Sequence, residues 1–244
     1  MPEQTPDTSV LTVSREGPVA IVTINRPQAM NSMSRAVFAA LEDTFSGFGE
    51  DVLAVVLTGA GDRAFCAGVD VKELTSGEVI KAPGDGSVGF GHTRFGLANF
   101  NGVVIAAING VAVAGGLELA LCCDIRIASK TARFGDAHAR VGLLPGALLS
   151  SLLPHLIGVG RAKEMSLSSR LIDADTADRW GLVNRVVEPD QLMEVATSLA
   201  QDIAKHDRTI LTTYNKLIDE NFGMTYAQAI DNEFRASQAF EGSH

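Results

Sequence analysis

Cysteine is scarce in this chain of 244 residues, which has three, at Cys66, Cys122 and Cys123. Their number is odd, they form no CxxC pair, and no pair of histidines lies near them in the sequence. The pattern therefore argues against a disulfide framework and against a zinc site, and we expect no bound metal. A reducing cytoplasm is the simplest setting for such a chain.

Positive charge and aromatic rings are also in short supply. The chain has 20 Lys and Arg against 29 Asp and Glu, a net charge of −9 at pH 7. Such an average field repels phosphate backbones and anionic membranes. With aromatic residues at only 6%, few ring surfaces are left for stacking on bases. We therefore expect neither a nucleic acid nor a membrane as a partner.

Signals for export, membrane insertion and phosphate-loop binding are missing as well. The first ten residues, MPEQTPDTSV, have acids and prolines where a signal peptide has a basic patch and an apolar run. Residues 103–123 are apolar and long enough to span a bilayer, but Asn109-Gly110 and Gly115-Gly116 interrupt them and Glu118 would lie in hydrocarbon. The Gly59-Ala60-Gly61 turn lacks the Lys-Ser/Thr of a phosphate loop.

The hydrophobic share of 46% is enough for a substantial core. Apolar runs on either side of Gly17-Pro18 predict a β-hairpin of residues 11–16 and 19–24. Ser34 is placed to cap a helix that runs to about Gly47. Residues 53–59 and 103–109 are continuously apolar, which is typical of parallel strands buried on both faces. The Gly-rich residues 75–94 predict a mobile loop beside a pocket.

Helices dominate the remaining predictions. We expect a strand at 124–129, a helix at 147–156 broken by Pro154, helices at 161–168 and 174–180, a strand at 182–187, and long helices that start at residues 189, 208 and 224.

Two glycine-bearing turns carry the first hint of chemistry. Residues 65–70 (FCAGVD) and 114–119 (AGGLEL) each follow an expected buried strand and precede a helix, a geometry that exposes backbone N–H groups. If the turns are adjacent in space, one N–H from each can hold a single oxygen in an oxyanion hole. Each turn alone is better explained as a helix entry with glycine for packing, because Gly-rich turns from strand to helix are common in α/β proteins.

Glu118 adds weight to the chemical interpretation. It is an acid within the apolar run AGGLELALCC, and a buried carboxylate is costly unless it is paired or used. Burial raises its pKa while a helix N-terminus lowers it, so the group is suited to act as a base near neutral pH. The alternative is a solvated acid in the first turn of a helix.

Four motifs occur in the order found in the crotonase superfamily, the enoyl-CoA hydratase/isomerase family, which this sequence resembles over nearly its whole length. They are Asn25-Arg26-Pro27 with Asn31, residues 64–70 (AFCAGVD), residues 108–124 (INGVAVAGGLELALCCD) and residues 134–146. The resemblance implies an α/β fold, a crotonase-like spiral of ββα units in residues 1–187 that carries an acyl-CoA site. A C-terminal helical region at 188–244 would serve packing and oligomerisation, as a homotrimer or a dimer of trimers. No cofactor is implied beyond the coenzyme A of the substrate.

The resemblance also implies roles for individual residues. The N–H groups of Ala67 and Gly115 would form the oxyanion hole, and Glu118 would be the first catalytic glutamate. Other residues would surround the substrate: Arg26, Ala64, Cys66, Gly68, Val69, Asp70, Gly116 and Leu143. On the residues themselves, Cys66 is more simply a packing residue, Asp70 a helix cap, and Arg26, like Lys72 and Lys216, a solvated cation.

The sequence departs from the family pattern at one position of consequence. Where the pattern FGxPExxxGxxPG has its glutamate, residues 134–146 (FGDAHARVGLLPG) have His138. With an ordinary pKa near 6.5, histidine can donate or accept a proton at neutral pH. His138 is therefore either the second catalytic group or a hydrogen-bonded core histidine, and Asp136 is a weaker candidate two residues earlier.

The resemblance implies an enoyl-CoA hydratase, which adds water reversibly to trans-2-enoyl-CoA to give 3-hydroxyacyl-CoA. Two alternatives stay open: an isomerase that uses one acid/base, and an acyl-CoA-binding protein without turnover.

Overall fold

Two β-sheets form the centre of the computed structural model, which describes residues 9–70, 72–73 and 94–240. The larger sheet has the order β1-β2-β3-β5-β7-β10 and the smaller one the order β4-β6-β8-β9. The larger contains β1 (Leu11–Glu16), β2 (Val19–Ile24), β3 (Ala54–Gly59), β5 (Val103–Ile108), β7 (Ile125–Ser129) and β10 (Arg185–Val187). The smaller contains β4 (Ala64–Cys66), β6 (Val111–Val113), β8 (Arg133–Gly135) and β9 (Ile172–Asp173).

The chain alternates between the two sheets as it advances. β3, β5 and β7 are parallel neighbours in the larger sheet, and the strand that follows each of them, β4, β6 and β8, takes a parallel place in the smaller sheet. This repeated step confirms the spiral α/β fold. The smaller sheet has no counterpart among the elements expected from residue pattern, because its strands have two or three residues each, too few to show a period.

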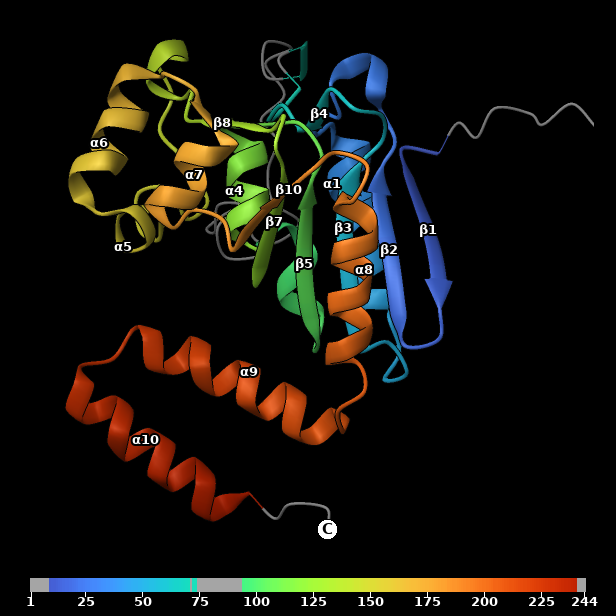
Figure 1. Ribbon diagram of the computed structural model, residues 1–244, viewed down its shortest axis with the longest axis vertical. Helices are drawn as coiled ribbons and strands as arrows, with labels where there is room; N and C mark the ends of the chain where they lie inside the picture. Colours follow the sequence, from blue (N-terminus) through green and yellow to red (C-terminus); the bar gives the residue numbers. More distant parts are fainter. Residues whose placement is uncertain (1–8, 71, 74–93, 241–244) are drawn as a thin grey trace, which may run out of the picture.

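Strands β3 and β5 are buried on both faces, as their continuous apolar sequences predict. Along β3, Val55 and Leu57 face one core cluster while Ala54 and Val56 face the other. The two-residue period of a strand divides the side chains between the faces in this way. On one face α8 (Leu192–Ile203) covers the larger sheet and contributes Leu192, Ala196 and Ala200 to the second cluster (Figure 1).

Local sequence signals set the ends of several helices. Ser34 caps α1 (Arg35–Gly47) by accepting from the N–H of Val37, and Asp173 caps α7 (Ala174–Trp180) by accepting from Thr176. The remaining helical elements are η1 (Pro27–Ala29), η2 (Arg94–Asn99), α4 (Gly115–Leu121), η3 (Ala139–Val141), α5 (Leu153–Ile157), α6 (Val159–Ser168), α9 (Arg208–Phe222) and α10 (Tyr226–Ala239).

The helix predicted at residues 147–156 is wrong in its extent. Only α5 forms, and Pro154 lies in its first turn instead of breaking it. Proline suits that position because the N–H it lacks has no acceptor inside the helix. Residues 147–152 form turns, with Leu148 in the left-handed region at φ 68°.

Helices α9 and α10 extend away from the sheets (Figure 1). The start of α9 is tied to the body by Arg208, whose guanidinium donates to the carbonyl oxygens of Glu50, Val52 and Asn101. The division of the chain after residue 187 stays a prediction, and α8, beyond that point, packs on the larger sheet. In the part of the chain that the structure describes, no helix combines the length and apolar character needed to cross a membrane. All but the last residue of the predicted mobile loop, 75–94, lies outside the described residues.

Candidate active site

Three parallel strands of the smaller sheet end side by side, and their turns make up the candidate site. β4 leads into residues 67–70, β6 into Ala114 and α4, and β8 into Asp136 and His138. The N–H of Ala114 donates to the carbonyl of Gly135 at 3.0 Å, which ties the second turn to the third. The carboxyl ends of parallel strands share one edge of a sheet, so residues far apart in sequence meet here.

The N–H groups of Val69 and Gly115 lie next to each other. A Cβ placed on Gly115 would be 3.4 Å from the nitrogen of Val69, and one on Gly68 would be 3.4 Å from the nitrogen of Gly115. Within the described residues neither N–H has an acceptor. Two free donors side by side fit an oxyanion hole.

The expectation that Ala67 supplies one of these donors needs correction. Its N–H donates to the carbonyl of Met30 at 3.1 Å, and the N–H of Asp70 donates to Met33 at 2.9 Å. Both groups therefore face residues 30–33. The Val69 N–H, which lies between them in the sequence after Gly68 at φ 92°, makes no hydrogen bond to residues 30–33, and its nitrogen lies beside Gly115.

Buried amide side chains hold the first turn in place. Asn31 is fully buried and donates to the carbonyl oxygens of Ala60 and Ala64, while its own carbonyl accepts from the Arg26 N–H. The side chain of Asn109 adds a second hydrogen bond to the carbonyl of Ala64, at 3.3 Å. Ala64 therefore contributes its backbone carbonyl, and the hydrogen bonds to this group hold β4, the strand that leads into the site.

Glycine at 116 is required by a close backbone approach. A Cβ at this position would lie 1.9 Å from the carbonyl oxygen of Cys66, far inside any tolerated contact. This proximity brings α4 against β4 and so brings the two donor turns together. Ala114, just before the helix, has φ 48° and ψ −120°, a strained conformation for a residue with a Cβ.

Glu118 is buried on α4, and its two carboxylate oxygens have different surroundings. Oε1 accepts the N–H of Ala147 at 2.6 Å, and Oε2 lies 3.9 Å from Nε2 of His138. Burial raises the pKa of Glu118, against the opposing effects of the backbone N–H groups of Ala147 and Gly146 and of the His138 charge. The carboxyl is therefore held rigidly on one side and is free to exchange a proton on the other.

His138 is connected to a second carboxylate. Its Nδ1 lies 2.6 Å from Oδ1 of Asp136, and its backbone N–H donates to the same oxygen at 2.9 Å. The hydrogen bond to Asp136 raises the pKa of His138, with support from the Glu118 charge and against the effect of burial. Burial alone would raise the pKa of Asp136, but hydrogen bonds from His138 and Ser166 lower it. Asp136 carries a negative charge beside a ring that favours a positive one.

Asp136 is more central to the site than the sequence predicts, and the N–H of Ala147 was not predicted at all. The signal for Asp136 was the spacing Asp-Ala-His, which permits a short turn closed by the aspartate.

A cavity of about 410 Å³ opens beside His138 and is mostly apolar. Its walls include Leu143, Leu149, Val159, Ala162 and Leu167, and Lys163 and Ser166 are the polar members from α6. Of the predicted substrate-binding residues, Leu143 lines this cavity. It is 46% exposed, as suits a side chain at an open wall.

Arg26 and Asp70 form an ion pair at 2.9 Å beside the first turn. Arg26 also donates to the carbonyl of Ser32, and Asp70 accepts the N–H of Lys72. Although burial opposes it, the pairing with Arg26 lowers the pKa of Asp70. Arg26 is thus a paired residue that braces the turn, unlike the solvated cation the residues alone suggested.

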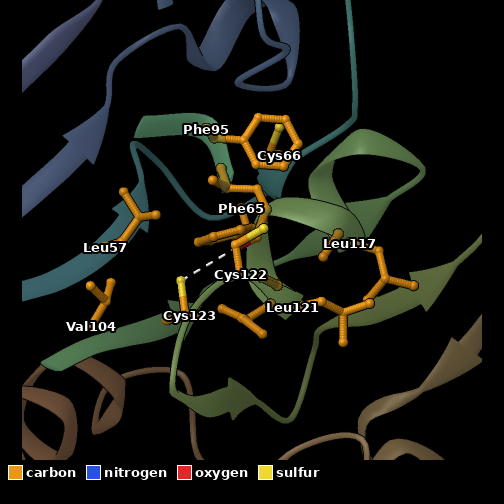
Figure 2. Packing of buried hydrophobic residues seen from close by; sticks show 14 of the residues in the cluster. Leu57, Phe65, Cys66, Phe95, Val104, Leu117, Leu121, Cys122 and Cys123 are labelled. Atoms are coloured by element: carbon orange, nitrogen blue, oxygen red, sulfur yellow. Dashed lines mark hydrogen bonds between the residues drawn. The ribbon is translucent and has the colours of Figure 1, made fainter. Parts of the chain in front are cut away.

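Cys66 lies within the hydrophobic core, close to Phe65 and Phe95 (Figure 2). Burial raises the pKa of its thiol to about 12, which leaves it protonated and unreactive near neutral pH. Cys122 and Cys123 are buried in the same cluster (Figure 2). The described residues contain no group of three or more His, Cys, Asp and Glu side chains arranged to hold a metal ion.

Comparison with known proteins identifies the family of this chain. The family model described as enoyl-CoA hydratase/isomerase matches residues 14–243. The chain belongs to the enoyl-CoA hydratase/isomerase family. It is 41% identical over 196 residues to the short-chain-enoyl-CoA hydratase of Clostridium acetobutylicum, a match that covers 80% of this chain and 75% of that protein.

Solved structures agree with this family assignment. Pseudomonas aeruginosa DspI superposes with a TM-score of 0.84 at 35% identity, over 100% of this chain and 93% of that one. A putative enoyl-CoA hydratase from Thermobifida fusca, solved in complex with CoA, superposes with a TM-score of 0.81 at 28% identity, over 95% and 92% of the two chains. The crotonase fold expected from the motifs is confirmed.

Proposed function

We propose that this member of the family is an enoyl-CoA hydratase that adds water reversibly to trans-2-enoyl-CoA. The observation that carries the proposal is the pair of proton-transfer groups, Glu118 and His138, with 3.9 Å between Oε2 and Nε2. Beside them are two backbone N–H groups that have no acceptor among the residues that the structure describes. Hydration needs a base that takes a proton from water, an acid that gives a proton to carbon, and hydrogen-bond donors for the developing oxyanion. The candidate active site has residues for all three.

In this proposal the thioester oxygen accepts from the N–H groups of Val69 and Gly115. As Glu118 takes a proton from water, the water oxygen bonds to the β carbon and the π electrons move onto the thioester oxygen as an enolate. His138 then gives the proton on Nε2 to the α carbon as the enolate collapses. Donors aimed at the enolate oxygen stabilise it more than the ground-state carbonyl, which is where their rate effect arises.

The presence of two competent groups favours hydration over the isomerase alternative, which needs only one. A binding protein without turnover has no use for Glu118, whose burial in charged form is unfavourable. Both alternatives remain outcomes of the experiment below.

The substrate of this proposal is an acyl-CoA thioester, and the apolar cavity beside His138 is suited to a hydrocarbon chain. We assign no cofactor beyond the coenzyme A portion, since proton transfer and two N–H groups suffice for the reaction. The three free cysteines fit a cytoplasmic setting.

Assembly as a homotrimer or a dimer of trimers belongs to the same proposal. Its support is the exposed apolar surface of the two last helices, which includes Ile218, Phe222, Ile230 and Phe234. Exposed apolar surface of this kind is typical of protein interfaces. Light scattering gives the mass in solution, and a monomeric mass would contradict the assignment.

The test of function is the loss of the conjugated thioester absorbance when a short trans-2-enoyl-CoA is mixed with the wild type, Glu118→Gln or His138→Gln. We expect turnover by the wild type and a decrease of at least about 10²-fold for each variant, the usual range for a lost acid or base. Wild-type protein that binds the thioester without hydrating it would overturn the proposal. Migration of a double bond in a 3-enoyl-CoA would then indicate the isomerase.

A further inference from the structure

His138 has an imidazole ring with one nitrogen already engaged by a carboxylate. Nδ1 faces Oδ1 of Asp136 at 2.6 Å, and Asp136 is only 3% exposed. An ionised carboxylate can only accept a hydrogen bond, so the proton of this contact belongs to Nδ1. Nε2 is then the nitrogen left to exchange protons, and it is the one that faces Glu118.

Asp136 is itself held in place. Its Oδ1 also accepts the backbone N–H of His138 at 2.9 Å, and the Ser166 side chain on α6 lowers the pKa of its carboxyl. The bond to the backbone N–H fixes the carboxylate relative to the turn after β8, so the carboxylate does not follow the ring if the ring rotates. The ring is therefore held in one orientation, with Nε2 directed to the site.

We infer that Asp136 is a positioning residue for the proposed hydration: it fixes the tautomer and orientation of His138 and stabilises the imidazolium that donates from Nε2. The inference rests on the function proposed above. When Glu118 and Asp136 are ionised and His138 is protonated, the three side chains have one transferable proton and a net charge of −1. A pair of glutamates that shares a single proton has the same number of transferable protons and the same net charge. The aspartate and histidine together therefore act as one protonated carboxylic acid.

The proton balance closes over one turnover. Water loses a proton to Glu118 as the C–O bond forms, and Nε2 of His138 gives its proton as the C–H bond forms at the α carbon. Glu118 is then protonated and His138 neutral, with the Nδ1 proton retained against Asp136. Transfer from Oε2 to Nε2, which lie 3.9 Å apart, restores the starting state through one bridging water or product hydroxyl.

The charged groups around the ring come from three elements. Asp136 precedes it after β8, Glu118 faces it from α4, and Lys163 lines the same cavity from α6. The two carboxylates favour the imidazolium, and Asp136 is the one in direct hydrogen-bond contact. Asp136→Asn therefore removes the dominant support of the cation, and its amide is able to donate to the ring and select the other tautomer.

The experiment measures kcat for hydration across pH in the wild type, Asp136→Asn and a matched control, Asp124→Asn. Asp124, a partly buried carboxylate, also accepts a backbone N–H, from Val104 at 2.7 Å, but it lies outside the site. We expect Asp136→Asn to lower kcat by about 10²-fold or more, as for other aspartates that orient a catalytic histidine. Activity falls at high pH as His138 loses its proton, and this limb should move to lower pH in Asp136→Asn only. An unchanged limb in this variant would overturn the inference.

Replacing His138 separates positioning from general support of the fold. In a His138→Glu background the carboxylic acid holds its own proton, so Asp136→Asn should cost at least tenfold less in kcat than it does in the wild type. An equal loss in both backgrounds would indicate a merely structural role and contradict the inference.

A readout without substrate keeps this inference distinct from the proposed function. The ¹⁵N chemical shifts of the His138 ring, assigned by their loss in His138→Gln, report the tautomer and the titration directly. We expect the Nδ1–H form in the neutral wild-type ring and a lower pKa of His138 in Asp136→Asn. Wild-type shifts retained in the variant would overturn the role of Asp136, whereas a wild type without hydration activity would overturn the proposed function alone.

Discussion

The oxyanion half of the candidate site consists of backbone, whereas the proton-transfer half consists of side chains. The backbone half is the pair of N–H groups at Val69 and Gly115, and the side-chain half is the set of Asp136, His138 and Glu118. The first depends on how strands and turns approach one another, so most side chains are free to vary there. The second depends on which titratable groups are present, so one substitution alters its chemistry. The histidine at 138 lies in the second half, where a change is accommodated by a neighbouring carboxylate.

The largest effect expected in the backbone half comes from Gly116→Ala. A methyl group 1.9 Å from the Cys66 carbonyl forces α4 away from β4, and we expect a loss of more than about 3 kcal/mol in the free energy of unfolding, at the upper end of overpacking effects. Thermal or urea denaturation measures it.

Gly160→Ala is the matched control. Gly160 is within α6, and a Cβ there meets nothing within 4 Å, so the alanine should stabilise the protein by about 0.5–1 kcal/mol. If both variants unfolded like the wild type, the close approach of Gly116 to Cys66 would not constrain the packing of α4 on β4.

The side-chain half should show a pH-dependent coupling between Asp136 and His138. The pKa of His138 is raised above its ordinary 6.5, so its contribution to stability is present below that value and is lost as pH rises through the folded-state pKa. The pKa of Asp136 is lowered from 3.8, so its contribution is present above that value and is lost as pH falls through the folded-state pKa. The pair is therefore most stabilising between these two ordinary values.

A double-mutant cycle with Asp136→Asn and His138→Gln measures this coupling through urea denaturation. We expect about 1–3 kcal/mol near pH 5.5, the range for hydrogen bonds to charged groups, and a clearly smaller value near pH 9.5. A coupling energy equal at both pH values would show that the ring is not a cation beside Asp136.

The smallest effect should come from Ala114→Gly, which sharpens the comparison by easing strain in the backbone half. At φ 48° and ψ −120° a glycine avoids backbone strain of about 1–3 kcal/mol. The greater conformational entropy of glycine in the unfolded chain offsets about 0.5–1 kcal/mol of this gain. We expect a net gain of about 1 kcal/mol. The same substitution at Ala112, within β6, should destabilise instead, and a gain at both positions would refute strain as the reason.

Much of the fold could be predicted from residue pattern. The runs at β3 and β5 identified strands buried on both faces, and Ser34 marked the start of α1. The strands of the smaller sheet could not be found this way, since three residues contain no full period, and they depend on parallel partners that are distant in sequence. Pro154 was misjudged because a proline breaks a helix or begins one according to where the helix starts.

Within the site, Glu118 was predictable as a lone acid in an apolar run. The assignment of Ala67 in place of Val69 failed because the direction of each N–H depends on pairing with residues 30–33, which local sequence does not reveal. The role of Asp136 was missed for a related reason. Its reach to His138 requires the turn after β8, and that turn is tied to the one after β6 by the hydrogen bond from Ala114 to Gly135.

The hydrogen bonds from Asn31 and Asn109 to Ala64 have a consequence for the rate at which the site folds. The hydrogen bond from Asn31 to Ala64 spans 33 positions of the sequence, and the one from Asn109 to Ala64 spans 45. The bond from the Ala147 N–H to Glu118 spans 29 positions. The chain loses entropy when such loops close, before the contacts between their ends stabilise the fold. Sites built from non-local contacts therefore assemble slowly. Recovery of enzymatic turnover during refolding should therefore lag behind recovery of helical circular dichroism, which makes turnover a marker for the last step of folding.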